Sequence, residues 1–249
     1  MCPSKTYFGA RYYDSDLSSW LSVDPMSDKY PSLSPYAYCA GNPVVLKDTD
    51  GRDILIWYKT ENGKMESYRY TGGNVSHSNG YVQKVCEAWN YNVMNGGGDP
   101  SYNAATNSNV TINVIETSGD SQHLNGKVYW NPELGLKTDQ GNILSPATIL
   151  DHELDHGLQR ALNNKQFNSD RTPNNDSQYG SKEERRVITG SEQKTAKANG
   201  EIKYGNTTRN NHLGDNVITK GVTSTVSDGA KTKTFNKKQY ENFINSFKE

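Results

Sequence analysis

The sequence predicts an α+β fold, and three observations support this class. Segments such as 109–117 alternate apolar and polar residues, which is the period of a strand with one buried face. Segments such as 146–162 repeat apolar residues every three or four positions, which is the period of an amphipathic helix. Hydrophobic residues make up 33% of the 249 residues and 22 are glycine, so we expect a modest core with long polar loops.

The first predicted element after residue 52 is a β-hairpin, because 53–59 and 64–70 flank an Asn62-Gly63 turn signal. Apolar residues at helical spacing then predict a helix over 79–94, which ends before three consecutive glycines. The remaining elements before residue 145 are predicted to be strands at 109–117 and 126–132 and then mostly loop over 133–144.

A helix is best indicated at 146–162, because Ser145 is a good N-cap and Pro146 suits the first turn. A second helix is predicted at 182–198, with Gly190 as a weak point inside it. A closing helix is predicted at 237–247, where aromatic and aliphatic residues share one face.

Composition divides the chain into two predicted domains, 1–52 and 53–249. The first is dense in Tyr, Pro and Ser, and it contains too few residues to close a core alone. It contains the motifs YFGARYYD at 7–14, WLSVDP at 20–25 and DTDGR at 48–52. These motifs resemble the RHS repeat-associated core signature over about residues 6–52.

The RHS resemblance implies that 1–52 is a β-rich remnant of a repeat shell and that 53–249 is the variable toxin domain that follows it. Members of that family are cleaved near this boundary beside an Asp-Pro-x-Gly motif. Thr49 stands in place of the proline here, so the resemblance does not imply cleavage of this chain. It implies synthesis in a bacterial cytoplasm, export by a secretion system as a passenger of its shell, action in a target cell and a cognate immunity protein.

The overall composition counts against several classes of protein. A formal charge of −1 gives no general attraction to nucleic acid or to anionic membranes. No apolar run approaches the roughly 20 residues of a membrane span, and the first residues have no apolar signal-peptide segment. The three cysteines are far apart in sequence, so they indicate neither a disulfide framework nor a thiolate zinc site.

The predicted helix over 146–162 contains the motif His152-Glu153-x-x-His156. Residues four apart lie nearly above each other on a helix, so the two imidazoles point the same way and can bind one ion. Glu153 projects beside that ion, where a carboxylate can take a proton from water. The spacing therefore predicts a catalytic zinc site with Glu153 as the general base. Asp155, inside the motif, is expected to be a surface or supporting carboxylate.

The stretch from about 110 to 212 resembles the zincin metallopeptidases, in particular the compact effector peptidases of secretion systems. The resemblance implies a small zincin-like domain in which a later helix supplies a glutamate as the third zinc ligand. We prefer Glu184, which shares a helical stripe with the apolar Ile188, and Glu183 and Glu192 are the alternatives.

Zincins bind the substrate peptide along an edge strand, and the resemblance implies Lys127, Val128, Tyr129 and Trp130 for that strand. An interior hairpin strand is the alternative for the same four residues. A residue that stabilises the oxyanion is also expected, and the candidates are Tyr204, Arg209 and His212.

The predicted function is that of a zinc-dependent endopeptidase toxin that hydrolyses a target protein. Two alternatives remain at this stage. A nuclease toxin would require metal-binding carboxylates or a histidine base beside a basic groove. A non-catalytic binding module would carry the His-Glu-x-x-His motif without using it.

Overall fold

A computed structural model describes residues 5–7, 12–14, 19–21, 54–106, 110–203 and 205–229. The chain divides into two compact units, Met1–Thr49 and Asp50–Glu249. The described part of the first unit is an antiparallel sheet of three short strands, β1 (Lys5–Tyr7), β2 (Tyr12–Asp14) and β3 (Ser19–Trp20). The rest of the segment that resembles the RHS core lies outside the described residues.

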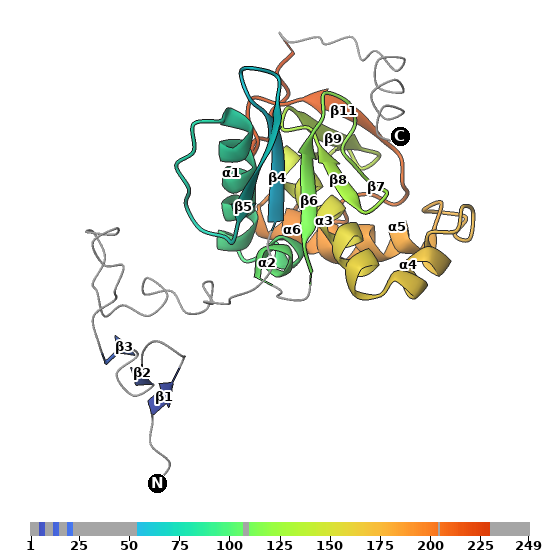
Figure 1. Cartoon of the computed structure of the whole chain (residues 1–249). Helices are drawn as coiled ribbons and strands as arrows, with labels where there is room; N and C mark the ends of the chain where they lie inside the picture. The colour runs from blue at the N-terminus through green and yellow to red at the C-terminus, as the bar shows by residue number, and fades with distance from the viewer. Residues whose placement is uncertain are drawn as a thin grey trace. The chain divides into compact units, whose positions relative to one another are not determined.

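The second unit contains a five-stranded mixed sheet, which the ribbon in Figure 1 shows with helices packed against it. Its strand order is β5-β4-β6-β8-β7. Strands β4, β6 and β8 are parallel, and the two outer strands are antiparallel to their neighbours. The strands are β4 (Ile54–Lys59), β5 (Met65–Tyr70), β6 (Ile112–Glu116), β7 (Gln122–Leu124) and β8 (Lys127–Trp130).

The predicted α+β class is confirmed for the described residues, and most of the predicted elements are present. The hairpin at 53–70 forms β4 and β5, paired from Ile54↔Tyr70 to Lys59↔Met65. Helix α1 (Gly80–Met94) begins after Asn79, whose side chain accepts hydrogen bonds from two backbone N–H groups of the first turn. The predicted helix at 237–247 lies outside the described residues.

The segment 133–144, predicted to be mostly loop, forms two strands, so this prediction was wrong. Strands β9 (Leu134–Thr138) and β10 (Ile143–Leu144) pair with each other, and β9 also pairs with β11 (Gly214–Ile218). Strand β11 lies about 80 residues further along the chain than β9, so no local pattern predicts their pairing. Helices α2 (Asp99–Thr106) and α4 (Asn164–Asp170) were also not predicted.

The core lies between the five-stranded sheet and helices α1, α2 and α3 (Pro146–Leu162). Trp89 and Trp130 are almost fully buried, and each donates its indole N–H to a backbone carbonyl, of Ser101 and Pro146 respectively. Cys86 is a buried thiol on α1. Every helix among the described residues is too short or too polar to cross a bilayer.

Helix α3 begins where it was predicted to begin. The side chain of Ser145 accepts a hydrogen bond from Thr148 N–H, and Pro146 occupies the first turn. Ser145 also donates its hydroxyl to Glu201 Oε1 at 2.5 Å and its N–H to Glu201 Oε2 at 3.1 Å. This N-cap therefore connects the start of α3 to a carboxylate that lies 56 residues further along the chain.

The Glu201 carboxyl makes the stability of this junction depend on pH. Burial raises the pKa of Glu201 from 4.5 to about 7, although hydrogen bonds from Ser145 oppose this shift. The folded chain therefore holds the proton more tightly than the unfolded chain, and this contribution to stability is lost as pH rises from about 4.5 to about 7. We expect the urea-unfolding free energy of the wild type to fall relative to that of Glu201→Gln across this range.

A matched control for the Glu201 measurement is Glu61→Gln, since Glu61 lies exposed in the β4–β5 turn. Its difference from the wild type should stay flat over the same pH range. A flat difference for Glu201→Gln as well would show that this carboxyl does not titrate with folding.

Candidate metal centre

Two imidazoles on α3 point toward one another. His152 and His156 are 4% and 1% exposed, and their Nε2 atoms lie 3.2 Å apart. The carboxylate of Glu153 belongs to the same buried group, in which the potential ligand atoms of the three residues lie within 4.8 Å of one another. The helix therefore presents both histidines and the glutamate to one small volume, as the spacing in the sequence predicted.

Glu184 completes this group from a second helix, α5 (Lys182–Val187). Its Oε2 atom lies 3.5 Å from His152 Nε2 and 3.4 Å from His156 Nε2. The N-cap Ser181 accepts a hydrogen bond from the backbone N–H of Glu184, which fixes the first turn of α5. The Glu184 side chain thus faces the histidines from the capped first turn of α5.

The three atoms form a triangle with sides of 3.2, 3.4 and 3.5 Å. Around a tetrahedral zinc ion with bonds of about 2.0–2.1 Å, two ligand atoms lie about 3.3–3.4 Å apart. Glu184 Oε2 is also buried and has no hydrogen-bond partner among the described residues, which is costly for a carboxylate oxygen unless a cation binds it. The residues present therefore fit a zinc ion.

The other two glutamate candidates contact the opposite sides of the imidazoles. Glu183 Oε1 lies at hydrogen-bond distance, 2.9 Å, from His156 Nδ1. Glu192 Oε2 lies 2.8 Å from His152 Nδ1, although at an angle that is not that of a hydrogen bond. A carboxylate at Nδ1 orients the ring and leaves Nε2 free for a metal. The structure therefore separates the three glutamates by the ring nitrogen that each one faces.

Glu192 reaches His152 because the second predicted helix is not a regular α-helix. The segment η3 (Ile188–Glu192) is a π-helix between α5 and α6 (Gln193–Ala198), and it includes Gly190. In an α-helix Glu192 would point about 80° away from Glu184, at about 100° per residue. The extra residue of a π turn reduces this angle to about 20°, so Glu184 and Glu192 share one face.

Arginines support the two outer glutamates. Arg209, a predicted oxyanion residue, donates to both oxygens of Glu192 at 3.1 and 2.6 Å and is only 5% exposed. Arg186 donates to both oxygens of Glu183 and also to Asp155 Oδ1 at 2.8 Å. Arg209 is thus engaged in an ion pair, and Asp155 has the supporting position, one of the two that the sequence left open.

The charges around the imidazoles favour a cation. Burial lowers the pKa of His152, but Glu184 and Glu192 outweigh it and raise the pKa to about 10. Burial raises the pKa of Glu192, but Arg209 and His152 outweigh it and lower the pKa to about 2. Burial also raises the pKa of Glu183, but Arg186 and His156 outweigh it and lower the pKa to about 2. The carboxylates stay ionised and produce a negative potential at the histidines.

The other two oxyanion candidates are His212 and Tyr204, and His212 lies beside the triangle. His212 Nε2 lies 3.4 Å from Glu184 Oε2, and its side chain is 54% exposed. Burial lowers the pKa of His212, with Glu184 opposing this shift. Tyr204 lies outside the described residues. His212 is therefore the candidate that borders the triangle from the solvent side.

The prediction that Lys127, Val128, Tyr129 and Trp130 form an edge strand was wrong. These residues form β8, which pairs with β6 on one side and with β7 on the other. Val128, Tyr129 and Trp130 are buried in the core, as the alternative of an interior hairpin strand required. The alternation of apolar residues cannot distinguish an edge from the interior of a sheet, because this depends on which segment pairs next to it.

The edge strand on this side is β7, which the sequence did not indicate. Asn125 and Gly126 both have positive φ, 51° and 77°, and they form the tight turn that joins β7 to β8. The carbonyl of His123 accepts a hydrogen bond from Arg171 Nη2 at 3.2 Å. The His123 ring lies 6.4 Å from that of His156, between centroids. An Asn-Gly pair is the one local signal that could have found this hairpin.

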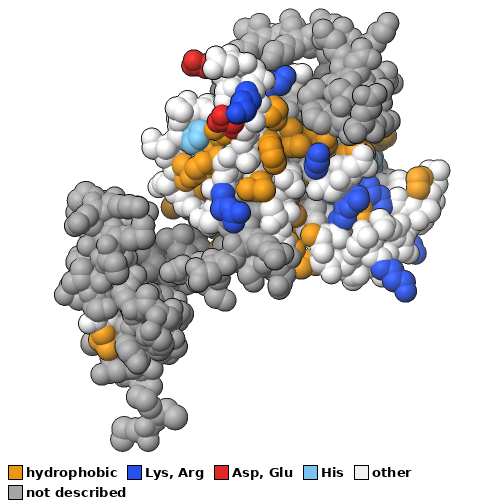
Figure 2. Space-filling view, viewed as in Figure 1, with side chains coloured by type: hydrophobic (Ala, Val, Ile, Leu, Met, Phe, Trp, Pro, Cys, Tyr) orange, Lys and Arg blue, Asp and Glu red, His pale blue; other side chains and the backbone are white. Residues whose placement is uncertain are grey.

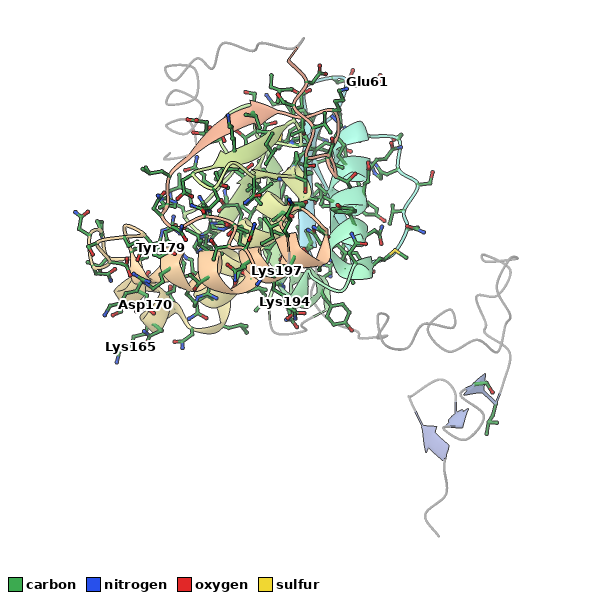
Figure 3. All side chains as sticks on the ribbon, turned by 180° about the vertical axis from the view of Figure 1, so that it is seen from behind. Glu61, Lys165, Asp170, Tyr179, Lys194 and Lys197 are labelled. Carbon is green, nitrogen blue, oxygen red and sulfur yellow. The ribbon has the colours of Figure 1, made fainter. Side chains whose placement is uncertain are left out.

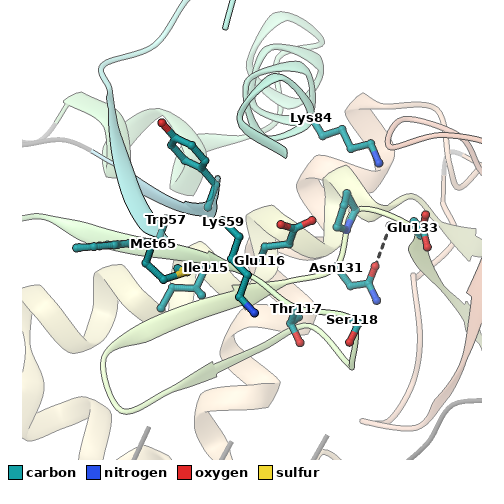
Figure 4. A pocket seen from close by; sticks show the side chains of 12 residues that line it. Trp57, Lys59, Met65, Lys84, Ile115, Glu116, Thr117, Ser118, Asn131 and Glu133 are labelled. Carbon is teal, nitrogen blue, oxygen red and sulfur yellow. Dashed lines mark hydrogen bonds between the residues drawn. The ribbon is translucent and has the colours of Figure 1, made fainter. Parts of the chain in front are cut away.

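A separate pocket of about 330 Å³ lies at the carboxyl ends of the parallel strands β4, β6 and β8 (Figure 4). Burial raises the pKa of Glu116 there, and Lys84 and Lys59 partly offset the shift. The pocket is lined by Trp57, Tyr58, Lys59, Met65, Lys84, Ile115, Glu116, Thr117, Ser118, Asn131, Pro132 and Glu133. None of these residues belongs to the group around His152, so this pocket is separate from the candidate metal centre.

Comparison with known proteins gives no relative from which a role for these residues could be taken. No family model, curated protein or solved structure matches the chain.

Proposed function

We propose that residues 53–249 form a zinc-dependent endopeptidase, the toxin domain of an RHS-type protein that acts on a protein of a target cell. The observation that carries the proposal is the triangle of His152, His156 and Glu184, whose sides match the ligand spacing of tetrahedral zinc. The resemblance of residues 6–52 to the RHS core supports the toxin part, and with it a shell and an immunity protein as partners.

His152, His156 and Glu184 would hold the ion, with Glu183 and Glu192 orienting the two imidazoles. A zinc ion there would supply a Lewis acid that lowers the pKa of water and polarises a carbonyl group. Two histidines and one carboxylate leave a fourth position for water or substrate, which is the arrangement of a catalytic zinc site.

Glu153 would act as the general base and then as the general acid. Its carboxylate shares the buried group with both histidines, and its short distance to their ligand atoms allows it to accept a proton from the attacking water. It would pass that proton to the nitrogen of the leaving amine, so the carboxylate is regenerated in each cycle. Glu153 is preferred over Glu183 and Glu192 because these two are held by arginines.

His212 would stabilise the oxygen of the carbonyl group under attack. It lies beside Glu184 and is exposed, whereas Arg209 is held by Glu192. A donor in this position stabilises the negative charge that develops on that oxygen. We do not assign the edge-strand role to β8, because β8 pairs with a strand on each side. On β7, the carbonyl of His123 is already bonded to Arg171.

The full chain, purified without chelators, should contain one zinc ion and should cleave an unfolded protein substrate. Dialysis against 1,10-phenanthroline should reduce cleavage to background, and added Zn²⁺ should restore it. A plasmid and a tRNA incubated with the same preparation serve as controls and should stay intact. Cleavage that persists after the metal is removed, or degradation of the nucleic acids, would contradict the proposal.

A further inference from the structure

A second pocket, of about 400 Å³, adjoins the candidate metal centre on the side of β7 and α4. None of the residues that line it is acidic, and two of them are arginines. They are His123, Leu124, Asn125, Arg160, Phe167, Asn168, Arg171, Thr172 and Pro173. On the face shown in Figure 2, Lys and Arg side chains gather where β7 and α4 lie, and no acidic side chain is visible there among the described residues.

Both arginines pack on the ring of Phe167. Their guanidinium carbons lie 6.0 Å (Arg160) and 5.5 Å (Arg171) from the ring centroid. No ion pair to either guanidinium is seen among the described residues. Two cations held against one ring repel each other, and an anion between them would remove this cost.

Two buried nitrogen atoms of this pocket have no hydrogen-bond partner among the described residues. They are Nε2 of His123, a residue that is 2% exposed, and Nη1 of Arg171. The other terminal nitrogen of Arg171, Nη2, donates to the His123 carbonyl, which fixes the direction of the guanidinium. A carboxylate has enough acceptor sites to bond to both of these atoms and to Arg160 at once.

The pocket begins one side chain away from a proposed zinc ligand. The His123 ring lies between those of His156 and Phe167, with centroid distances of 6.4 Å and 5.4 Å. An extended peptide advances about 3.3 Å per residue, so a group bound here belongs to a residue near the scissile bond.

We propose that this pocket, which we call the arginine pocket, binds a carboxylate of the peptide substrate through Arg160, Arg171 and His123. The identity of the ligand as a peptide rests on the proposed peptidase function. The carboxylate belongs either to an Asp or Glu side chain or to the carboxyl terminus of the substrate, since both present the same group. The peptidase therefore selects peptides by a negative charge at a fixed distance from the bond that it cleaves.

Binding is tested first, without reference to cleavage. The zinc-loaded full chain is titrated with N-acetylglutamate α-amide, which has only a side-chain carboxylate, and with N-acetylglutamine, which has only a terminal one. N-acetylglutamine amide has neither and is the control. The resonances of the arginine Nε–H groups report binding. We expect at least one acid to shift those of Arg160 and Arg171, and the diamide to shift neither.

Arg160→Gln is the decisive variant, because no hydrogen bond of the Arg160 side chain is seen among the described residues and the change removes one cation. We expect it to weaken carboxylate binding about tenfold or more, as measured on Arg171. Lys165→Gln removes the same charge from α4 but at a side chain that projects away from the body of the protein (Figure 3), and it should leave binding unchanged. Arg160→Lys should restore part of the affinity. An unchanged unfolding midpoint shows that the variants fold.

Cleavage of a mixed peptide library provides the second measurement. The wild type should cut at a fixed distance from an acidic residue or from the carboxyl terminus, and Arg160→Gln should lose this preference. Cleavage without such a preference, or acids that bind equally to Arg160→Gln, would overturn the arginine pocket and leave the peptidase proposal standing. Carboxylate binding without any cleavage would uphold the pocket as an anion site and refute the peptidase.

Discussion

Glu153→Gln should remove peptide hydrolysis while leaving zinc bound. The amide has nearly the same size as the carboxylate but cannot accept the proton of the attacking water, so we expect kcat to fall by about 10²- to 10⁴-fold. Zinc content should stay at one ion per chain, because the proposed ligands are His152, His156 and Glu184. The measurement compares initial rates of cleavage and metal content in the same preparations.

Glu61→Gln provides the matched control for Glu153, since it makes the same chemical change at an exposed site in the β4–β5 turn (Figure 3). It should cleave at the wild-type rate. If Glu153→Gln retains full activity, the general base is another residue. If it loses the metal, Glu153 is a ligand and the division of roles on α3 is wrong.

Glu184→Gln should weaken zinc binding more than the same change at either neighbouring glutamate. Glu184 Oε2 lies close to both Nε2 atoms, whereas Glu183 and Glu192 face Nδ1 atoms. Loss of a supporting carboxylate typically reduces metal affinity by about 10- to 100-fold, and loss of a ligand should reduce it further. Competition with a coloured zinc chelator at constant pH gives the three affinities.

The three glutamate variants require a check on folding. Glu192→Gln leaves the buried Arg209 without the carboxylate that it contacts, and Glu183→Gln leaves Arg186 with Asp155 as its anionic partner. Tryptophan fluorescence during urea unfolding provides it, since Trp89 and Trp130 are buried in the core. A larger loss of zinc affinity in Glu183→Gln or Glu192→Gln, with folding preserved, would transfer the ligand role to that residue.

Local patterns in the sequence were sufficient where an element has a clear cap or turn signal and a regular apolar period. The hairpin of β4 and β5 followed from alternation and an Asn-Gly turn, and α3 followed from Ser145, Pro146 and its apolar stripe. The same helical period placed His152 and His156 on one side of α3. The strand β11 was missed, because its pairing with β9 joins segments that are distant in sequence. The hairpin of β9 and β10 is local, and it was nevertheless predicted to be loop.

The sequence by itself determined the α+β class, the helix α3 and the two histidines one turn apart, because helical geometry is set by neighbouring residues. Only the tertiary structure decided that Glu184 faces both Nε2 atoms, that Glu183 and Glu192 lie behind the rings, and that Arg209 is paired with Glu192. It also placed β8 inside the sheet. These outcomes depend on how α5 and η3 pack against α3, and on a π turn that rotates Glu192 onto the face of Glu184, so the periodicity of one segment does not determine them.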